Sequence, residues 1–167
     1  MYIPLNNKSN YTLLSSMLKI DDLINYAKNN NISSIALADT NMFGTMEFYK
    51  KCQKENIKPV IGLNILGTDY EINLYAEDYT GYKNLIKLAT IQSERVITIK
   101  DLEKYNKNII GILPFTHKNK YDELNTIYIN LYLGYKNKEE EKEARIITKN
   151  LLLYFLYINF LEKRQYF

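Results

Sequence analysis

Polar side chains that could do chemistry follow two apolar segments in the first quarter of the chain. Asn6 and Lys8 follow a short apolar start, and Asp39 ends the apolar run at 32–39. Proteins of the α/β class often keep their functional groups at the carboxyl ends of strands. A carboxylate there can bind Mg²⁺ or Mn²⁺ together with phosphate oxygens, provided that several ligands converge. Asp39 is therefore the best-placed candidate ligand, and its alternative role is a turn or N-cap residue before a helix at 42–56.

Other familiar catalytic and metal-binding patterns do not occur in the sequence. His117 is the only histidine and Cys52 the only cysteine, so a zinc site of common spacing cannot be formed. The six glycines are scattered and make none of the Gly-rich phosphate-binding motifs. We interpret His117 as a surface side chain among lysines and Cys52 as a buried thiol. A single cysteine also fits a reducing compartment, so we expect a cytoplasmic protein.

The composition predicts a globular protein with one domain. The 167 residues are 46% hydrophobic and 25% charged, which suits a core of ordinary size. The net charge of +3, from 22 basic and 19 acidic side chains, is too small to indicate nucleic-acid binding. The longest apolar run, at 151–161, is shorter than the roughly 20 residues that span a bilayer. We expect neither direct DNA binding nor a membrane span.

The elements that must position these residues alternate between strands and helices, which predicts an α/β fold with a largely parallel sheet. Apolar residues at Ile20, Leu23, Ile24 and Ala27 have the spacing of an amphipathic helix. Strands are expected at 2–5, 32–39, 59–66, 70–77, 108–115 and 125–134. Helices are expected at 19–31, 42–56, 81–93 and 138–150. The run at 151–161 fits either a buried strand or a core helix.

Several separate motifs resemble one known family in their order and spacing. They are "SNYTLL" at 9–14, "ALADTNMFGTMEFYKKC" at 36–52, "NIKPVIG" at 56–62 and "GYKNLIKL" at 81–88. Together they resemble the N-terminal PHP (polymerase and histidinol phosphatase) domain of bacterial DNA polymerase III alpha subunits. The resemblance is strongest over 2–115 and weaker over 116–167. It implies one PHP-like domain over 1–167, folded as a distorted (β/α) TIM-like barrel that this length need not complete.

The resemblance also implies a metal site whose ligands are largely lost. The family's first strand ends in alternating histidines, and Pro4, Asn6 and Lys8 stand at the matching positions. Asp39 is kept, but Thr40 replaces the histidine that follows it, Asn64 replaces a glutamate, and Glu71 or Ile72 stands where another histidine is expected.

These replacements disfavour a metal ion. Pro has no metal-binding side chain, Asn is a weak neutral ligand, and the charge of Lys8 repels cations. Family members bind Zn, Mn or Mg, but here we predict no catalytic residue, no metal and no cofactor. We also hypothesise that Lys8 replaces the missing cationic charge by pairing with Asp39.

The function implied is a catalytically inactive structural or protein-interaction module of a replicative DNA polymerase. The parent family is a DNA-directed DNA polymerase, a nucleotidyltransferase, but this chain lacks the motifs for nucleotidyl transfer. The expected partners are the remaining polymerase domains or replisome proteins, with a proofreading exonuclease as a further candidate. Two alternatives stay open: a free-standing metal-dependent phosphoesterase of the same superfamily, and an adaptor that uses the apolar run at 151–161 to bind a partner.

Overall fold

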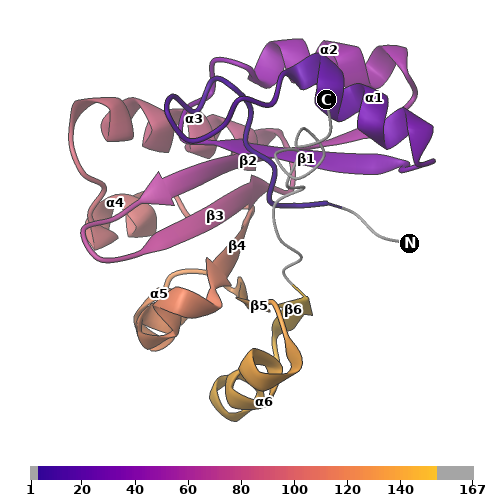
Figure 1. Ribbon diagram of the computed structural model, residues 1–167. Helices are drawn as coiled ribbons and strands as arrows, with labels where there is room; N and C mark the ends of the chain where they lie inside the picture. Colours follow the sequence, from indigo (N-terminus) through magenta and orange to yellow (C-terminus); the bar gives the residue numbers. More distant parts are fainter. Residues whose placement is uncertain (1–3, 154–167) are drawn as a thin grey trace.

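The computed structural model describes residues 4–153, which form a six-stranded sheet with helices packed around it (Figure 1). The strands lie across the sheet in the order of the chain. They are β1 (Ser34–Asp39), β2 (Lys58–Leu66), β3 (Glu71–Ala76), β4 (Ile109–Pro114), β5 (Asn130–Tyr135) and β6 (Leu151–Leu153). The helices are α1 (Ile20–Asn29), α2 (Thr45–Lys54), α3 (Tyr79–Glu94), α4 (Ile99–Lys104), the 3-10 helix η1 (Phe115–Lys120), α5 (Tyr121–Asn125) and α6 (Lys138–Ile147).

The sheet is largely parallel, as expected, with one reversed strand. The pairs β1–β2, β4–β5 and β5–β6 are parallel, whereas β3 runs antiparallel to both neighbours. The cause is the short connection after β2, where the Gly67 N–H donates to the Tyr70 carbonyl at 2.8 Å and closes a hairpin. A connection this short can join only antiparallel strands, because parallel strands need a crossover of a dozen or more residues.

The first helix and strand pack as their sequences predict. The four apolar residues of α1 that have helical spacing are all buried, and Asp21 and Asp22 occupy its first turn, where the helix dipole favours acidic side chains. All six residues of β1 are buried, as expected for a strand covered on both faces. Phe48 and Cys52 of α2 complete this core cluster around α1 and β1.

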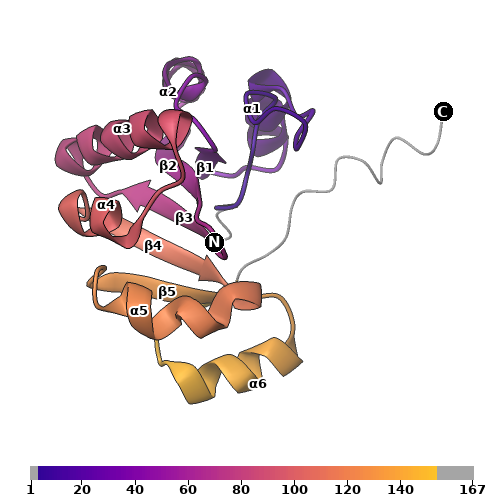
Figure 2. The ribbon, with the colours of Figure 1, turned by 90° about the vertical axis from the view of Figure 1, so that its left-hand side faces the viewer.

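A larger core cluster lies under the middle and later strands. It includes Leu63 and Ile65 of β2, Leu85 and Leu88 of α3, and the fully buried Tyr128 before β5. Figure 2 shows the sheet curving from β1 to β5 with the helices on its outer side. The polar side chains of residues 4–9 reach this sheet at the end of β1 and the start of β3.

Most of the predicted elements are confirmed with small shifts at their ends. The helices expected at 19–31, 42–56, 81–93 and 138–150 correspond to α1, α2, α3 and α6. The short helices α4, η1 and α5 were not predicted, because pieces of five or six residues show little periodicity. The strand expected at 125–134 begins only at Asn130, after α5 and a turn.

At the two ends of the described chain, only part of each expected element can be compared with the structure. Of the strand expected at 2–5, residues 2 and 3 lie outside the described residues, and residues 4 and 5 form no strand. The Ala36 N–H nevertheless donates to the Pro4 carbonyl at 3.1 Å and the Ala38 N–H to the Asn7 carbonyl at 2.8 Å. Of the run at 151–161, the part within the described residues is strand β6, and 154–161 lies outside them. Among residues 4–153, no helix is both long and apolar enough to cross a membrane.

Candidate functional site

The candidate site is formed where segment 4–9 lies beside β1 and bonds to Asp39 and to the first residues of β3. Asp39 is the last residue of β1, and Asn64 lies near the end of β2. The hairpin after β2 places the beginning of β3, with Glu71 and Asn73, at this same edge. Segment 4–9 supplies buried polar side chains, among them Asn6 and Lys8.

Asp39 organises the turn that follows segment 4–9. Its side chain is buried, with only 2% of the residue exposed. One carboxylate oxygen accepts from the Ser9 N–H at 2.6 Å and from the Thr12 hydroxyl at 2.7 Å, and the other accepts from the Ser9 hydroxyl at 2.6 Å. The N-cap of α2 is Gly44, so the alternative that Asp39 caps this helix is wrong.

Lys8 pairs with a different carboxylate from the one hypothesised. Its Nζ donates to Glu71 Oε1 at 2.8 Å, and its side chain is 7% exposed. The hypothesised Lys8–Asp39 pair is therefore wrong. The physical reason is that both Asp39 oxygens accept hydrogen bonds from Ser9 and Thr12, whereas Glu71 has room for a cation.

A chain of amide side chains continues from Glu71 back to segment 4–9. Asn64 Nδ2 donates to Glu71 Oε1 at 2.8 Å and to Asn73 Oδ1 at 2.7 Å. Asn73 Nδ2 donates in turn to Asn6 Oδ1 at 3.0 Å. Asn64 and Asn73 are completely buried and stand opposite each other in the β2–β3 pair. Asn64 Oδ1 has no hydrogen-bond partner.

The charges around Glu71 keep it ionised. Burial raises the pKa of this carboxyl, whereas Lys8 lowers it through its hydrogen bond and its positive charge, and the net pKa is below its ordinary value. The hydrogen bond from Asn64 and the charge of His117 lower the pKa further. His117 itself is half-buried in η1.

The residues present do not fit a divalent metal ion. Of the six positions that the resemblance implied, Asn6, Lys8 and Asn64 belong to the network around Glu71, and Asp39 binds the adjacent turn. The Thr40 N–H donates to the Thr12 hydroxyl at 3.2 Å, and Pro4 contributes only its carbonyl. Within residues 4–153, no three His, Cys, Asp or Glu side chains come together as a metal cluster.

The sequence missed Ser9, Thr12 and Asn73 as members of the site. The first two lie in the "SNYTLL" motif, which precedes the buried strand that ends at Asp39, and this order of motifs was the available signal. Asn73 follows Glu71 by two residues, so strand alternation places both side chains on one face of β3. Cys52 is a buried thiol, as predicted, and burial raises its pKa to about 12.

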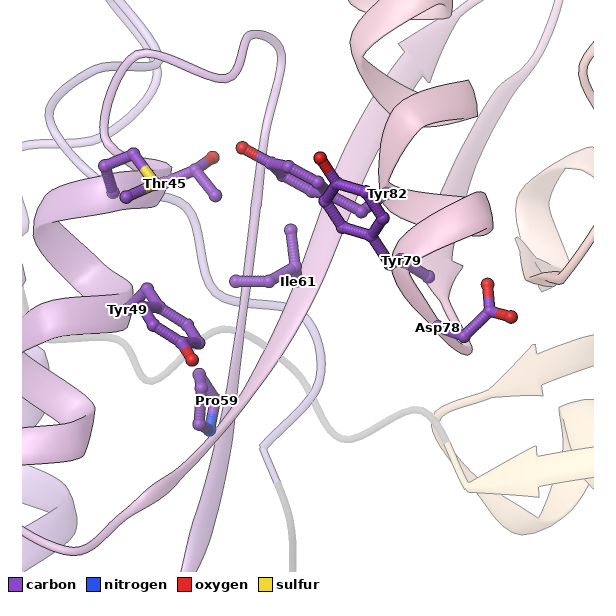
Figure 3. A pocket seen from close by; sticks show the side chains of 9 residues that line it. Thr45, Tyr49, Pro59, Ile61, Asp78, Tyr79 and Tyr82 are labelled. Carbon is purple, nitrogen blue, oxygen red and sulfur yellow. The ribbon is translucent and has the colours of Figure 1, made fainter.

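A separate groove of about 500 Å³ lies between α2 and α3 (Figure 3). Its lining residues are Thr45, Met46, Tyr49, Pro59, Ile61, Ala76, Asp78, Tyr79 and Tyr82. The one carboxylate, Asp78, caps α3 by accepting from the Gly81 N–H at 2.9 Å and also accepts from Asn108 at 2.6 Å. The groove therefore brings together aromatic and apolar surface but no reactive side chains.

Comparison with known families agrees with the motifs and their positions. The family model of the PHP domain matches residues 4–161, which is nearly the whole chain. The chain belongs to the PHP domain family. The strand ends and segment 4–9 that form the site all lie within the matched PHP residues.

Relatives of the PHP chain include large polymerase subunits. It is 42% identical over 104 residues to a DNA polymerase III subunit alpha of Ureaplasma parvum, covering 62% of this chain and 10% of the relative. It is 34% identical over 119 residues to that of Halalkalibacterium halodurans (65% and 11%) and 38% identical over 142 residues to that of Borreliella burgdorferi (68% and 12%). The chain thus spans about a tenth of the length of these relatives.

A solved structure supports the fold. It is that of a Bifidobacterium adolescentis protein assigned provisionally as a metal-dependent phosphoesterase. The TM-score is 0.51 at 7% sequence identity, covering 90% of this chain and 76% of that one. At this identity the likeness concerns the fold alone, and it agrees with the TIM-like α/β architecture that the resemblance implied.

Proposed function

We propose that this chain is the PHP portion of a replicative DNA polymerase III alpha subunit of bacterial type and acts in the cytoplasm as a non-catalytic structural module. The similarity to three alpha subunits over about two thirds of the chain supports the replicative context. The partners would be the remaining domains of the polymerase, and an exonuclease subunit is a further candidate. No nucleotidyl transfer is assigned to this chain.

The observation that carries the non-catalytic role is the pairing of Lys8 with Glu71. A metal-dependent phosphoesterase needs electron-pair donors aimed at an open cation position. In this site the buried ammonium group of Lys8 stands among the candidate ligands. Glu71, the carboxylate whose charge could attract a metal ion, is instead paired with this ammonium group at 2.8 Å. The remaining candidate ligands are neutral amides, which hydrogen-bond to one another, and Asp39. The Asp39 carboxylate accepts hydrogen bonds from the adjacent turn.

The catalytic question is tested with the full chain and a phosphate ester. The purified protein is incubated with p-nitrophenyl phosphate in the presence of Mn²⁺, Zn²⁺ or Mg²⁺, and in parallel as the Asp39→Ala variant. We expect no release of nitrophenol above the variant with any of the metals. Metal-dependent release that disappears in Asp39→Ala would contradict the proposal and favour the phosphoesterase alternative.

The structural role is tested by transplantation into a relative. The chain replaces the matching region of the Ureaplasma parvum alpha subunit, and primer extension by the chimera is measured. We expect extension close to that of the parent subunit, whereas a subunit lacking the region should be insoluble or inactive. An inactive chimera, or an active subunit without the region, would contradict the structural role.

A further inference from the structure

Segment 4–9 is buried although little backbone pairing holds it. Within residues 4–153, two backbone hydrogen bonds join it to β1, and both use carbonyls of the segment as acceptors. Yet Asn6, Asn7, Lys8 and Ser9 are all at most 9% exposed. Polar side chains this deep are stable only when their hydrogen bonds are made inside the protein. Most of the other hydrogen bonds that attach the segment involve side chains, including that of the Tyr75 hydroxyl to the Leu5 carbonyl and that of the Ser9 hydroxyl to Asp39.

The side chains form a closed ring that ties the segment to two strands. Lys8 binds Glu71, and Asn64 binds both Glu71 and Asn73. Asn73 then binds Asn6, two residues before Lys8 in the same segment. The ring thus leaves segment 4–9 at one residue, crosses β3 and β2, and returns to the segment at another. Removing one member interrupts the ring.

The charges of the ring make it the alternative to a metal ion rather than a remnant of a metal site. A buried ammonium group requires an anionic partner, and a divalent cation added beside it would meet direct repulsion. Glu71, with 34% of its side chain exposed, balances the charge of Lys8, whose side chain is 7% exposed. Asn64 supports the same carboxylate oxygen with a second donor.

We propose that the ring of Lys8, Glu71, Asn64, Asn73 and Asn6 is a metal-independent clasp that holds segment 4–9 on the sheet. This inference deepens the proposed non-catalytic role and rests on it. The clasp bridges the same chain segments that ligands to a metal would otherwise join, but it does so with one ion pair and three amides. Fastening of the segment then needs no metal, and it depends on Lys8 and Glu71 together.

The coupling is tested by hydrogen exchange in the full chain. The variants are Lys8→Met, Glu71→Gln and their combination, since Gln keeps an acceptor oxygen for Asn64. The reporters are the amides of Ala36 and Ala38, which donate to segment 4–9, and the amides of β4 serve as an internal reference. Lys28→Met and Glu55→Gln alter an exposed ion pair and serve as matched controls.

The expected result is a local and non-additive change. Glu71→Gln should speed exchange at Ala36 and Ala38 by about tenfold or more, because it leaves a buried charge unpaired. The double variant should recover most of this protection, because no unpaired charge remains. The control variants should change the exchange rates of Ala36 and Ala38 by less than about twofold. Additive effects of the two single variants, or unchanged exchange in both, would overturn the clasp.

Metal independence is tested with the unmodified chain, so this test does not require that any variant folds. Thermal unfolding is measured with excess EDTA, MnCl₂ or ZnCl₂. We expect the same midpoint in all three, and a midpoint lowered by EDTA or raised by a metal would overturn metal independence. Phosphate ester hydrolysis by a chain with an unchanged midpoint would instead refute the non-catalytic role while supporting the clasp.

Discussion

Asn64 of β2 and Asn73 of β3 face each other across an antiparallel strand pair, with Nδ2 of the first 2.7 Å from Oδ1 of the second. Both are completely buried, which is unusual for amide side chains, and their neighbours supply hydrogen bonds to both amides although Asn64 Oδ1 has no partner. This contact joins the charged half of the network, at Glu71, to its neutral half, at Asn6.

Replacing Asn73 by Ala should therefore destabilise the protein. The change removes the acceptor of one Asn64 hydrogen bond and the donor to Asn6, and each buried group left without a partner costs about 1–3 kcal/mol. We expect the free energy of unfolding to fall by roughly 2 kcal/mol or more. Urea denaturation followed by circular dichroism measures this. Asn84→Ala, which removes an exposed hydrogen bond to the Lys107 carbonyl, is the control and should cost less than about 1 kcal/mol. An equal loss in both variants would contradict the prediction.

Asp39 should be important for stability. Its carboxylate accepts three hydrogen bonds from Ser9 and Thr12, and bonds to charged groups contribute about 1.5–3 kcal/mol each. Asp39→Ala should lower the free energy of unfolding by about 3 kcal/mol or more, and Asp39→Asn by less, since the amide still accepts at one oxygen. Chemical denaturation compares both with Asp122→Asn, which alters an exposed carboxylate. Wild-type stability in Asp39→Ala would show that the turn does not need this residue.

The Glu71 carboxyl should make stability depend on pH in the acid range. Its pKa in the folded protein lies below the ordinary value of 4.5, because Lys8, Asn64 and His117 together outweigh the effect of burial. Its contribution is complete above pH 4.5 and is lost as the pH falls through the folded pKa. The positive charges of Lys8 and His117 both lower the pKa of Glu71 and so favour its ionised form.

The measurement is the free energy of unfolding between neutral pH and about pH 3, in the unmodified chain and in Glu71→Gln. The difference between the two proteins should shrink as the pH falls below 4.5. Other carboxyls, such as Glu47 and Glu55, also have lowered pKa values, but their contributions are common to both proteins and cancel. A difference that grows on acidification would mean that the sign is wrong.

Cys52 should be unreactive in the folded protein. It is completely buried, and burial raises its pKa to about 12, so almost none of it is thiolate at neutral pH. We expect modification by a thiol reagent such as DTNB to proceed no faster than unfolding and to be fast in denaturant. Rapid, stoichiometric labelling of the native protein would contradict the buried position of this side chain.

Local pattern was sufficient to predict the elements with long, regular periodicity. The helical spacing of Ile20, Leu23, Ile24 and Ala27 predicted α1, and the apolar run before Asp39 predicted β1. The family and the TIM-like fold also followed from motifs in the sequence and agree with the comparisons. The short helices α4, η1 and α5 were not predictable in this way, because one or two turns carry almost no periodic signal.

What the sequence by itself determined is where the main strands end and that Asn6, Lys8, Asp39 and Asn64 lie near those ends, because strand ends and motif order are local properties. Only the tertiary structure decided which of these side chains pair with one another. The reversal at Gly67–Tyr70 turns β3 back along β2 and brings Glu71 to the site, where it takes the Lys8 ammonium group. Asp39 is closer to Lys8 in sequence, but Ser9 and Thr12 occupy its oxygens. Ion pairing depends on distances and on competing donors in space, and spacing along the chain contains neither.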